Sequence, residues 1–274
     1  MTTAPTFDLL RTLRYLAARA TPWRSTVVAR SRSGLRFRCH ARDVVGRRIL
    51  RTGELDPVVT PLLGSLVESQ AEAGWFVDVG ANIGWYSTSL ASSSGVTGVV
   101  AIEPEPHNHE LLQDNVRMNG LESRIRIVNC AVGREAGTAT MHLYRGSNRG
   151  RHSIATDHGG RGSGRIDVPV RRLDEVLAEA GLAEAPIAAV KMDVEGYESE
   201  AIAGGGETLR RAGLLAIEIN PPLCPGGPEA NGAMLDEIEA AGLRPHWCDD
   251  PDQVLTMGKI KSRTTACDVI FLRA

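Results

Sequence analysis

The sequence predicts an α/β protein built on a doubly wound, seven-stranded and mostly parallel sheet with helices on both faces. From residue 75 onward, short apolar runs alternate with longer runs of helical periodicity, an order that requires parallel pairing through helical crossovers. Proline or glycine stands where helices should begin or end, at Pro104, Pro106, Gly120, Gly181 and Gly242. With 274 residues, of which 42% are hydrophobic, the chain has the size of one domain with an extension.

We assign residues 1–60 to an N-terminal extension and residues 61–274 to the main domain, with an insertion at 145–165. Leucines at helical spacing predict an amphipathic helix over 6–19, and short strands are expected within 25–39 around a Ser-Gly turn. The main domain should contain, in order, strand 75–79, helix 83–92, strand 97–102, helix 106–118, strand 125–129, a hairpin of 138–144 with 166–171, helix 173–180, strand 187–193, helix 198–204, strand 213–219, helix 230–241, strand 244–248 and strand 266–272.

A glycine turn after the first strand of the main domain predicts a cofactor site. Gly80 and Gly84 allow a tight turn and a close approach to a ligand, and Asn82 is expected to cap the following helix. Glu103 closes the next strand about 25 residues after the first one, where an acidic side chain accepts both hydroxyls of a ribose.

The turn does not have the spacing of a dinucleotide or P-loop motif. It contains no G-x-G-x-x-G and no lysine followed by serine or threonine, so a pyrophosphate would lack its usual nest and its cation. A cofactor with adenosine but no phosphates suits it better, and S-adenosylmethionine (SAM) is the common one. The alternative is a tight strand-to-helix turn with no ligand.

Charge is unevenly distributed although the net value is −2. Residues 1–51 contain twelve arginines and only two acidic residues, Asp8 and Asp43. This basic front indicates either attraction to an anionic surface or nucleic acid, or a solvated face or subunit contact such as that of a homodimer. No aromatic residues interleave the arginines, so a nucleic-acid platform is disfavoured.

Cysteine usage and the N-terminus predict a soluble, cytoplasmic protein. The five cysteines are odd in number and lack C-x-x-C or zinc spacing, which is typical of buried, reduced thiols. The first 20 residues contain no continuous apolar stretch, so neither a signal peptide nor a membrane span is expected. The cysteines are Cys39, Cys130, Cys224, Cys248 and Cys267.

Two later strand ends carry polar side chains toward the same edge. Asp193 and Glu195 follow one predicted strand, and Glu218 and Asn220 close the next. Asp193, Glu218 and Asn220 form a candidate oxygen-ligand set for Mg²⁺ bridging an acceptor hydroxyl. In the alternative, Asp193 orients cofactor or acceptor, and Glu218 caps a helix or pairs with an arginine.

Several longer runs resemble FkbM-type SAM-dependent methyltransferases. They are FVDVGANIGWYS at 76–87, AIEPEPHNHELLQDNVRMNG at 101–120, NCAVG at 129–133, VPVRRLDEVL at 168–177 and VKMDVEGYESEAIAGG at 190–205. The resemblance spans about residues 42–222, although Asp56 stands where that family usually has glutamate. It implies a Rossmann-like SAM methyltransferase fold and O-methylation of a sugar, glycolipid or secondary-metabolite hydroxyl, with no acceptor named.

The resemblance also implies roles for individual residues. Glu103 would bind the ribose, and Asp193 would face the sulfonium. The other implied cofactor residues are Asp78, Gly80, Asn82 and Gly84 at the methionine and the turn, and Asn129, Cys130 and Ala131 at the adenine.

The insertion at 145–165 is rich in glycine and arginine and is interpreted as a lid over a polyhydroxylated or acidic acceptor, the alternative being a disordered loop. A hydroxyl acceptor must lose a proton, and histidine has the side-chain pKa nearest neutrality. His152 is the first candidate base, His142 the second and His158 the third.

Two other functions stay open. The run Asn220-Pro221-Pro222-Leu223 is similar to one found in methyltransferases of nucleobase amino groups, but it lacks the aromatic fourth residue and follows the strand after Asp193. A non-catalytic SAM-binding module is the third class, and the intact turn and acidic strand ends argue against it.

Overall fold

The computed structural model describes residues 9–20, 26–144, 152–155, 162–224, 226–248 and 255–274. In chain order the elements are α1 (Leu9–Arg19), β1 (Thr26–Arg30), β2 (Arg36–His40), α2 (Val44–Thr52), α3 (Val59–Glu68), β3 (Gly74–Val79), α4 (Trp85–Leu90), β4 (Val96–Ile102), α5 (Pro106–Met118), β5 (Ile125–Val128), β6 (Ala131–Val132), β7 (Gly137–Tyr144), β8 (Gly162–Arg171), α6 (Leu173–Glu179), β9 (Ile187–Met192), α7 (Glu198–Ala203), α8 (Gly206–Arg211), β10 (Ala212–Ile219), α9 (Gly227–Ala240), β11 (Leu243–Trp247), α10 (Met257–Lys261) and β12 (Cys267–Arg273).

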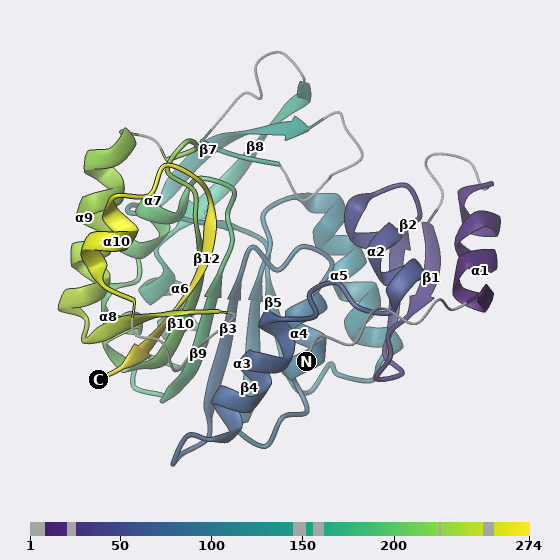
Figure 1. The fold of residues 1–274 in the computed structure, drawn as a ribbon, viewed down its shortest axis with the longest axis horizontal. Coiled ribbons are helices and arrows are strands. Elements are labelled where there is room, and N and C mark those ends of the chain that lie inside the picture. Colours follow the sequence, from purple (N-terminus) through teal and green to yellow (C-terminus); the bar gives the residue numbers. More distant parts are fainter. Residues whose placement is uncertain (1–8, 21–25, 145–151, 156–161, 225, 249–254) are drawn as a thin grey trace.

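The central sheet confirms the predicted fold class. Its seven strands lie in the order β11-β12-β10-β9-β3-β4-β5, and β12 alone runs against the others (Figure 1). From β3 the chain adds β4 and β5 on one side, whereas β9 and β10 lie on the other. The order of strands therefore reverses between β3 and β9, the kind of point at which doubly wound sheets bind ligands beside their carboxyl ends.

Side-chain alternation along the strands divides the core into two layers. In β3, Phe76 packs into the layer under α3, α4 and α5, whereas Val77 and Val79 pack into the layer under α6, α7, α8 and α9. Both layers consist of buried, mainly aliphatic side chains, as expected of strands covered on both faces. A smaller sheet of β6, β8 and β7 lies over the carboxyl edge of the central strands (Figure 1).

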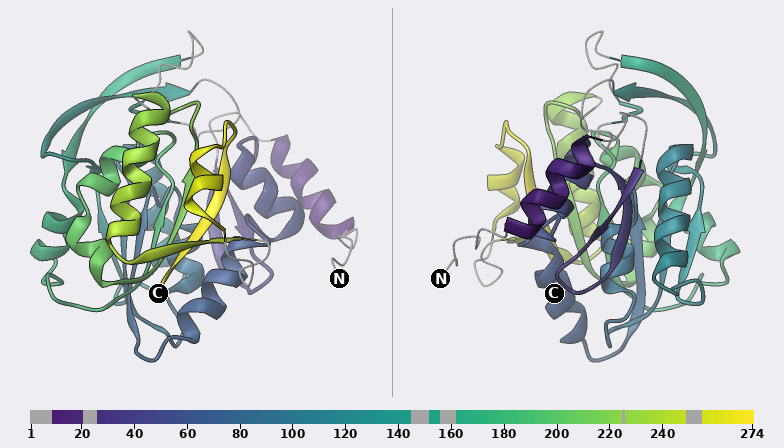
Figure 2. Two further views of the ribbon diagram at one scale, coloured as in Figure 1. Left: turned by 60° about the vertical axis from the view of Figure 1, so that its left-hand side comes forward. Right: turned by 90° about the vertical axis from the view of Figure 1, so that its right-hand side faces the viewer.

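The extension forms a separate layer beside α5. β1 and β2 make an antiparallel hairpin against α2, and α1 lies outermost (Figures 1 and 2). Its core continues into the main domain, because Phe37 of β2 stacks on Trp85 of α4 with ring centroids 5.0 Å apart. The extension thus supports the helix that follows the glycine turn.

The structure departs from the sequence expectations in several elements. Helix α4 begins at Trp85, with Gly84 as its N-cap residue. Asn82 adopts a left-handed conformation (φ 52°) and its Oδ1 accepts a hydrogen bond from the N–H of Ile83, so the predicted cap by Asn82 is wrong. Four helices were not expected, namely α2, α3, α8 and α10. Within the described ranges, no helix has the length and apolar character needed to cross a bilayer.

The five cysteines form no disulfide, as predicted, although only Cys39 and Cys130 are fully buried. The leucines of the first helix face outward, because α1 packs on the extension through Ala18 and Tyr15.

Two asparagines of α5 fasten the hairpin to the main domain. Asn115 Oδ1 accepts from the N–H of Arg38 (2.6 Å), and its Nδ2 donates to the carbonyls of Arg38 (3.2 Å) and Ile83 (2.8 Å). One turn later, Asn119 exchanges two similar bonds with Arg36, at 2.9 and 2.8 Å. Asn115 is fully buried, so its amide links hairpin, helix and glycine turn without competition from water.

Replacing Asn115 with alanine should therefore destabilise the protein by roughly 2 to 4 kcal/mol, because three main-chain groups lose their partner in a buried position. Equilibrium denaturation in urea measures the change. Asn119→Ala is the matched control and should cost about 1 kcal/mol, since that side chain is partly exposed. Equal losses from the two variants would contradict this account of Asn115.

Candidate functional site

Two neighbouring pockets open at the carboxyl ends of β3 and β9. We call the first the cofactor pocket and the second the acidic pocket; both include Asp193. The cofactor pocket is lined by Val79, Gly80, Asn82, Ile102, Glu103, Pro104, Asn108, Cys130, Ala131, Val132, Met141, His152, Ile154, Asp193, Val194, Glu195 and Tyr197.

The glycine turn brings the two central strands into main-chain contact. Gly80 has φ +79°, and a Cβ built on it would lie 1.9 Å from the carbonyl oxygen of Asp193. The turn is tied to the next strand as well, because the N–H groups of Gly80 and Ala81 both donate to the carbonyl of Ile102 at 3.0 Å. Only glycine suits this position, on conformational and steric grounds.

Glu103 is held in place by main-chain amides at the floor of the cofactor pocket. Its Oε2 accepts from the N–H of Asn82 (2.8 Å) and its Oε1 from the N–H of Glu105 (2.9 Å). Burial outweighs these bonds and raises the pKa of Glu103 to about 7. An ionised carboxylate has about four acceptor positions; the two main-chain amides and the side chain of Asn108 use three of them, so about one stays available for a hydroxyl group in the pocket.

The opposite wall of the cofactor pocket is small and mostly apolar. Cys130, Ala131 and Val132 line it after β5. Asn129 supports this wall from behind, since its amide donates to the carbonyls of Glu103 (2.8 Å) and Pro104 (3.1 Å).

A tight turn at 193–197 closes the third side. Glu195 and Gly196 have φ +53° and +99°, and β9 ends at Met192, one residue before the predicted end of this strand. The buried carboxylate of Glu198 organises this turn, because its Oε1 accepts from the N–H groups of Val194 and Gly196 at 3.1 Å. Burial raises the pKa of Glu198 to about 7.

The acidic pocket lies on the other side of Asp193. Lys191 Nζ is 2.9 Å from Asp193 Oδ2 and 4.7 Å from the ring centre of Tyr86, whose hydroxyl donates to Asp56 (2.8 Å). The full lining is Asp56, Val59, Tyr86, Lys191, Met192, Asp193, Ala216, Ile217, Glu218, Cys248, Asp268 and Val269.

Carboxyl groups crowd this pocket. Glu218 of β10 and Asp268 of β12 are direct partners in the antiparallel register. Burial, followed by the charges of Asp193 and Asp268, raises the pKa of Glu218 to about 7, and burial also raises the pKa of Asp268. Burial opposes the charged form of Lys191, but Asp193 and Asp78 outweigh it and raise the pKa of this ammonium.

The structure brings together most of the residues expected to bind a cofactor. Those that line the cofactor pocket are Gly80, Asn82, Glu103, Cys130, Ala131 and Asp193, and the candidate base His152 lines it as well. The other three predicted cofactor residues do not line this pocket; they are Asp78, Gly84 and Asn129. Asp78 is fully buried and its Oδ2 accepts from the N–H (3.0 Å) and the hydroxyl (2.5 Å) of Ser87, so it anchors α4.

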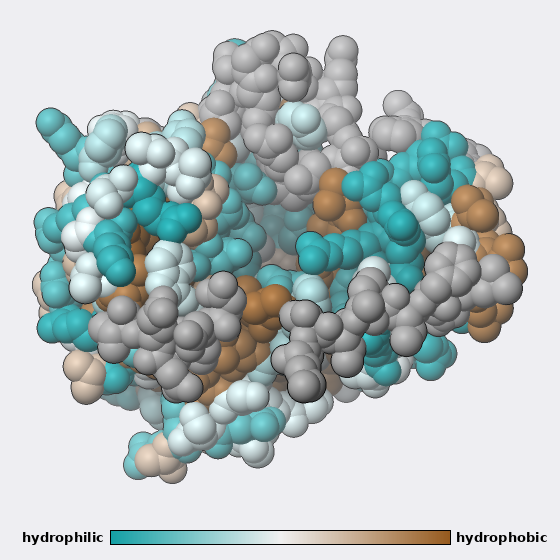
Figure 3. Space-filling view, in the orientation of Figure 1, coloured by the Kyte–Doolittle hydropathy of each residue, from teal (hydrophilic) through white to brown (hydrophobic). Residues whose placement is uncertain are grey.

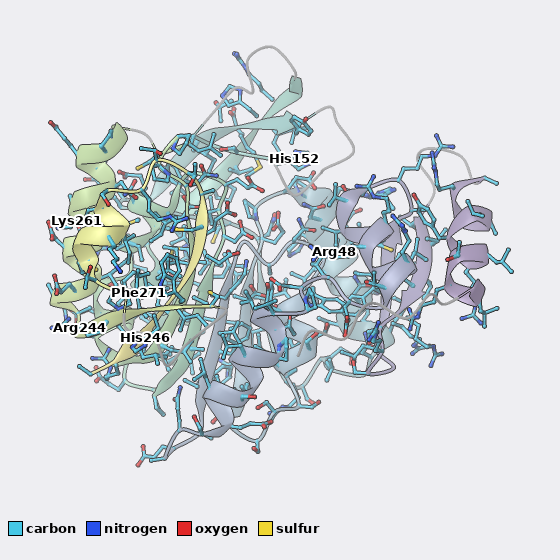
Figure 4. The ribbon with its side chains drawn as sticks, in the orientation of Figure 1. Arg48, His152, Arg244, His246, Lys261 and Phe271 are labelled. Atoms are coloured by element: carbon cyan, nitrogen blue, oxygen red, sulfur yellow. The ribbon has the colours of Figure 1, made fainter. Side chains whose placement is uncertain are left out.

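The candidate bases are placed differently from one another. His152 lines the cofactor pocket above the carboxyl edge of the sheet (Figure 4). Its Nδ1 accepts from the N–H of Tyr144 (2.9 Å), so the neutral imidazole carries its proton on Nε2. His142 alternates along β7 with Met141, which lines the pocket, and is directed to the opposite face. His158 lies outside the described residues.

Most of the insertion at 145–165 also lies outside the described residues, and only its segments 152–155 and 162–165 are described. Residues 152–155 run alongside β7, where His142 and Ser153 exchange main-chain bonds of 2.8 and 3.2 Å. The hydroxyl of Ser153 donates to the carbonyl of Glu195 (2.6 Å), which ties this part of the insertion to the turn at 193–197.

The candidate metal ligands are only partly together. Asp193 and Glu218 line the acidic pocket, and Asn220 donates from Nδ2 to Glu218 Oε1 at 3.4 Å. Lys191 is already the cation beside Asp193. In the part of the chain that the structure describes, no three His, Cys, Asp or Glu side chains are grouped as a metal site.

Sequence reasoning did not find four residues of the acidic pocket as site residues, namely Asp56, Tyr86, Lys191 and Asp268. A signal existed for Lys191, which is the one charged residue within the apolar strand β9. Asp268 similarly interrupts an otherwise apolar stretch of β12. Asp56 and Tyr86 carried no comparable signal, because they reach the pocket only through the packing of α3 and α4.

Comparison with known proteins gives a family match. The family model described as the Methyltransferase FkbM domain matches residues 78–245, which is more than half of the chain. A methyltransferase from Sordaria araneosa, sdnD, is 28% identical over 159 residues, which cover 48% of this chain and 61% of that protein. The 2-O-methyltransferase NoeI of Sinorhizobium fredii is 27% identical over 179 residues, covering 61% of this chain and 72% of that protein.

Solved structures are more distant in sequence. An O-methyltransferase from Bacillus cereus in complex with SAH covers 80% of this chain and 81% of its own, with 14% identity and a TM-score of 0.46. TYW2 of M. jannaschii in complex with AdoMet covers 93% of this chain and 89% of its own, with 12% identity and a TM-score of 0.42.

Gly80→Ala should destabilise the protein by more than about 3 kcal/mol, because the added methyl group collides with the carbonyl of Asp193 in addition to forcing a left-handed alanine. Gly120→Ala is the matched control. Gly120 has φ +66° with no atom within 4 Å of its built Cβ, so it isolates the conformational cost of about 1 kcal/mol. Urea denaturation compares the two, and similar losses would show that the contact with Asp193 relaxes easily.

Proposed function

Because the chain belongs to the FkbM methyltransferase family, we propose that it is a SAM-dependent O-methyltransferase acting on a hydroxyl of a saccharide, glycolipid or glycosylated metabolite. The observation that carries the proposal is the meeting of two unlike pockets at Asp193. One has the features of an adenosine site and the other is lined by carboxylates, which accept hydrogen bonds from hydroxyl groups. The name of the relative NoeI, a 2-O-methyltransferase, supports oxygen as the acceptor atom.

The cofactor pocket suits SAM in its donor set and its shape. Glu103 presents its carboxylate to the pocket, where it can accept from a ribose hydroxyl. The small side chains of Cys130 and Ala131 leave room for a flat base. Gly80 leaves the turn open to close approach, and Asp193, paired with Lys191, adds a carboxylate at the border of the pocket. None of the described residues that line the pocket is lysine or arginine, so a diphosphate would have no cation there.

When bound, SAM supplies an electrophilic methyl group, which passes from sulfur to the acceptor oxygen in one in-line displacement. The protein aligns the reactants. Asp193, shared by both pockets, marks the place where oxygen and methyl group meet. Asp56, Glu218 and Asp268 orient the acceptor through its hydroxyl groups, and their negative charges favour a cationic methyl donor beside them.

We assign the acceptor proton to Glu218 rather than to His152 or His142. A carboxylate with a pKa of about 7 matches the working pH and lines the pocket that holds the acceptor. The Nδ1 lone pair of His152 accepts a hydrogen bond from the N–H of Tyr144, so this nitrogen is not placed to take up the acceptor proton. His142 is directed to the other face of β7.

Magnesium does not suit Asp193, Glu218 and Asn220 as the structure arranges them. The ammonium of Lys191 lies against Asp193, and a divalent cation at the same carboxylate would repel it at close range. We therefore assign no step to a metal.

The function is tested with SAM carrying a labelled methyl group, offered with glycans, glycolipids, small polyols, DNA and RNA. We expect label in a hydroxylated acceptor, with turnover unchanged in excess chelator. Label in a nucleobase amino group, or cofactor binding with no transfer to any acceptor class, would overturn O-methylation. Loss of turnover in chelator would restore the metal.

Glu103→Gln should weaken SAM binding by roughly 10- to 100-fold at pH 8, because a ribose hydroxyl loses a charged acceptor. The free protein should also bind SAM more tightly as pH rises through about 7, since the pKa of Glu103 is raised to about 7 and the ionised form is the stronger acceptor for a hydroxyl. Isothermal titration calorimetry across pH 6 to 8.5, about one unit on each side, measures both effects.

Glu198→Gln serves as the control for this pH dependence. Glu198 is equally buried and has a similarly raised pKa, but it does not line the cofactor pocket. The affinity change near pH 7 should persist in Glu198→Gln and vanish in Glu103→Gln. The opposite pattern would show that the ribose does not bind at Glu103.

Glu218→Gln should lower kcat by roughly 10² to 10⁴ and abolish the rise of kcat/KM through pH 7. SAM affinity should change little, because Glu218 does not line the cofactor pocket. His152→Ala should keep this pH dependence and lower kcat by less than about tenfold, because the Nδ1 of His152 is already bonded to Tyr144. If His152→Ala removes the pH dependence and Glu218→Gln does not, histidine is the base.

A further inference from the structure

The outermost helix turns its leucines away from the protein. Leu10, Leu13 and Leu16 of α1 are 58%, 53% and 55% exposed, and they follow one another at helical spacing. The inward side of the helix instead carries Ala18, which is 9% exposed, and Arg11, whose Nη1 donates to the carbonyl of Arg30 at 2.9 Å. We call Leu10, Leu13 and Leu16 the leucine face; it is visible as an apolar patch over α1 (Figure 3).

The leucine face continues into a groove between α1 and β1. Leu10 and Ala17 of the helix line this groove together with Val28 of β1, which is 51% exposed. Leu10, Leu13, Leu16 and Val28 make up four of the five large apolar side chains that are most exposed among the described residues. Contiguous exposed apolar surface of this kind marks a contact with a partner or a membrane.

The surroundings of the leucine face are strongly basic. Arg14 and Arg19 are exposed on the same helix, and Arg30, Arg36 and Arg51 are exposed on the elements beside it. Between residues 9 and 51 the sequence contains one acidic residue, Asp43, and its carboxylate is used to cap α2. An apolar stripe with a cationic rim complements a surface that is apolar inside and anionic at its border.

This charge pattern argues against a second copy of the chain as the partner. A two-fold dimer through the leucine face would place the arginine rim of one copy against that of the other. Like charges would then meet where apolar contact is made, with no acidic side chain between residues 9 and 42 to separate them. A bilayer with anionic headgroups meets both requirements, because the leucines enter the interfacial region and the arginines pair with phosphates.

We propose that the leucine face and its arginine rim bind the surface of anionic lipid membranes. The contact is peripheral and reversible, since a helix of eleven residues carries few apolar side chains. It should therefore require anionic lipid and weaken as salt screens the arginines. The proposal does not depend on the proposed methyl transfer.

Vesicle co-sedimentation of the full chain tests it, with phosphatidylcholine vesicles and with mixed phosphatidylcholine and phosphatidylglycerol vesicles. We expect binding to the mixed vesicles only. Leu13→Gln/Leu16→Gln and Arg14→Gln/Arg19→Gln should each weaken it by at least about tenfold. Val58→Gln is the matched control, because Val58 is 48% exposed but lies outside α1, and it should bind as the unaltered chain does.

Other outcomes overturn the proposal. They are absence of binding to either vesicle, equal binding to both, or a loss shared by Val58→Gln. Light scattering after gel filtration adds an independent arm: a dimer that Leu13→Gln/Leu16→Gln dissociates would assign the leucine face to a second copy. All replaced side chains are already exposed, so folding should be preserved, and circular dichroism confirms it for each variant.

Discussion

The main-chain contact between Gly80 and Asp193 sets the geometry of everything at the carboxyl edge of the sheet. It joins the ends of β3 and β9 at the point where the strand order reverses, and Asp193 lines both pockets there. A side chain on Gly80 would separate the strands and with them the cofactor pocket and the acidic pocket. The extension contributes from outside, because Phe37 packs on Trp85 just after the glycine turn.

Buried glutamates hold the loops around this contact. Glu103 and Glu198 each accept two main-chain N–H bonds, and each fixes one turn beside the cofactor pocket. Folding raises the pKa of both from 4.5 to about 7, which means that their ionised forms are less favourable in the folded state. The contribution of these groups to stability is therefore greatest below pH 4.5 and declines as pH rises through 7. Keeping Glu103 and Glu198 ionised at this site therefore lowers the free energy of unfolding.

Local signals predicted the frame of the molecule well. Helix α5 begins at Pro106 and ends at Met118 as expected, because a proline at its first turn and a glycine just past its end mark both limits. The spacing from the glycine turn to Glu103 likewise depends on one local unit, in which β3, the turn, α4 and β4 follow one another along the chain. Asn82 failed as a cap because two left-handed residues, Asn82 and Gly84, delay the start of α4.

Features that depend on long-range packing could not be read from the chain. The acidic pocket combines Asp56, Tyr86, Lys191, Glu218 and Asp268, which belong to five segments. Helical periodicity located the leucines of α1 but could not tell which side of the helix meets the protein. Likewise, the hydrogen bond from Tyr144 to His152 decides which ring nitrogen is protonated, and no sequence pattern reports it.

The amides of Asn115 and Asn119 have a consequence for the hairpin of the extension. They bond to Arg38 and Arg36, alternate residues along the side of β2 that faces away from β1. Each amide offers one donor and one acceptor, as a neighbouring peptide would, so α5 occupies the edge of β2 in place of a third strand. This protects β2 from pairing with a strand of another chain, a frequent start of aggregation in small open sheets.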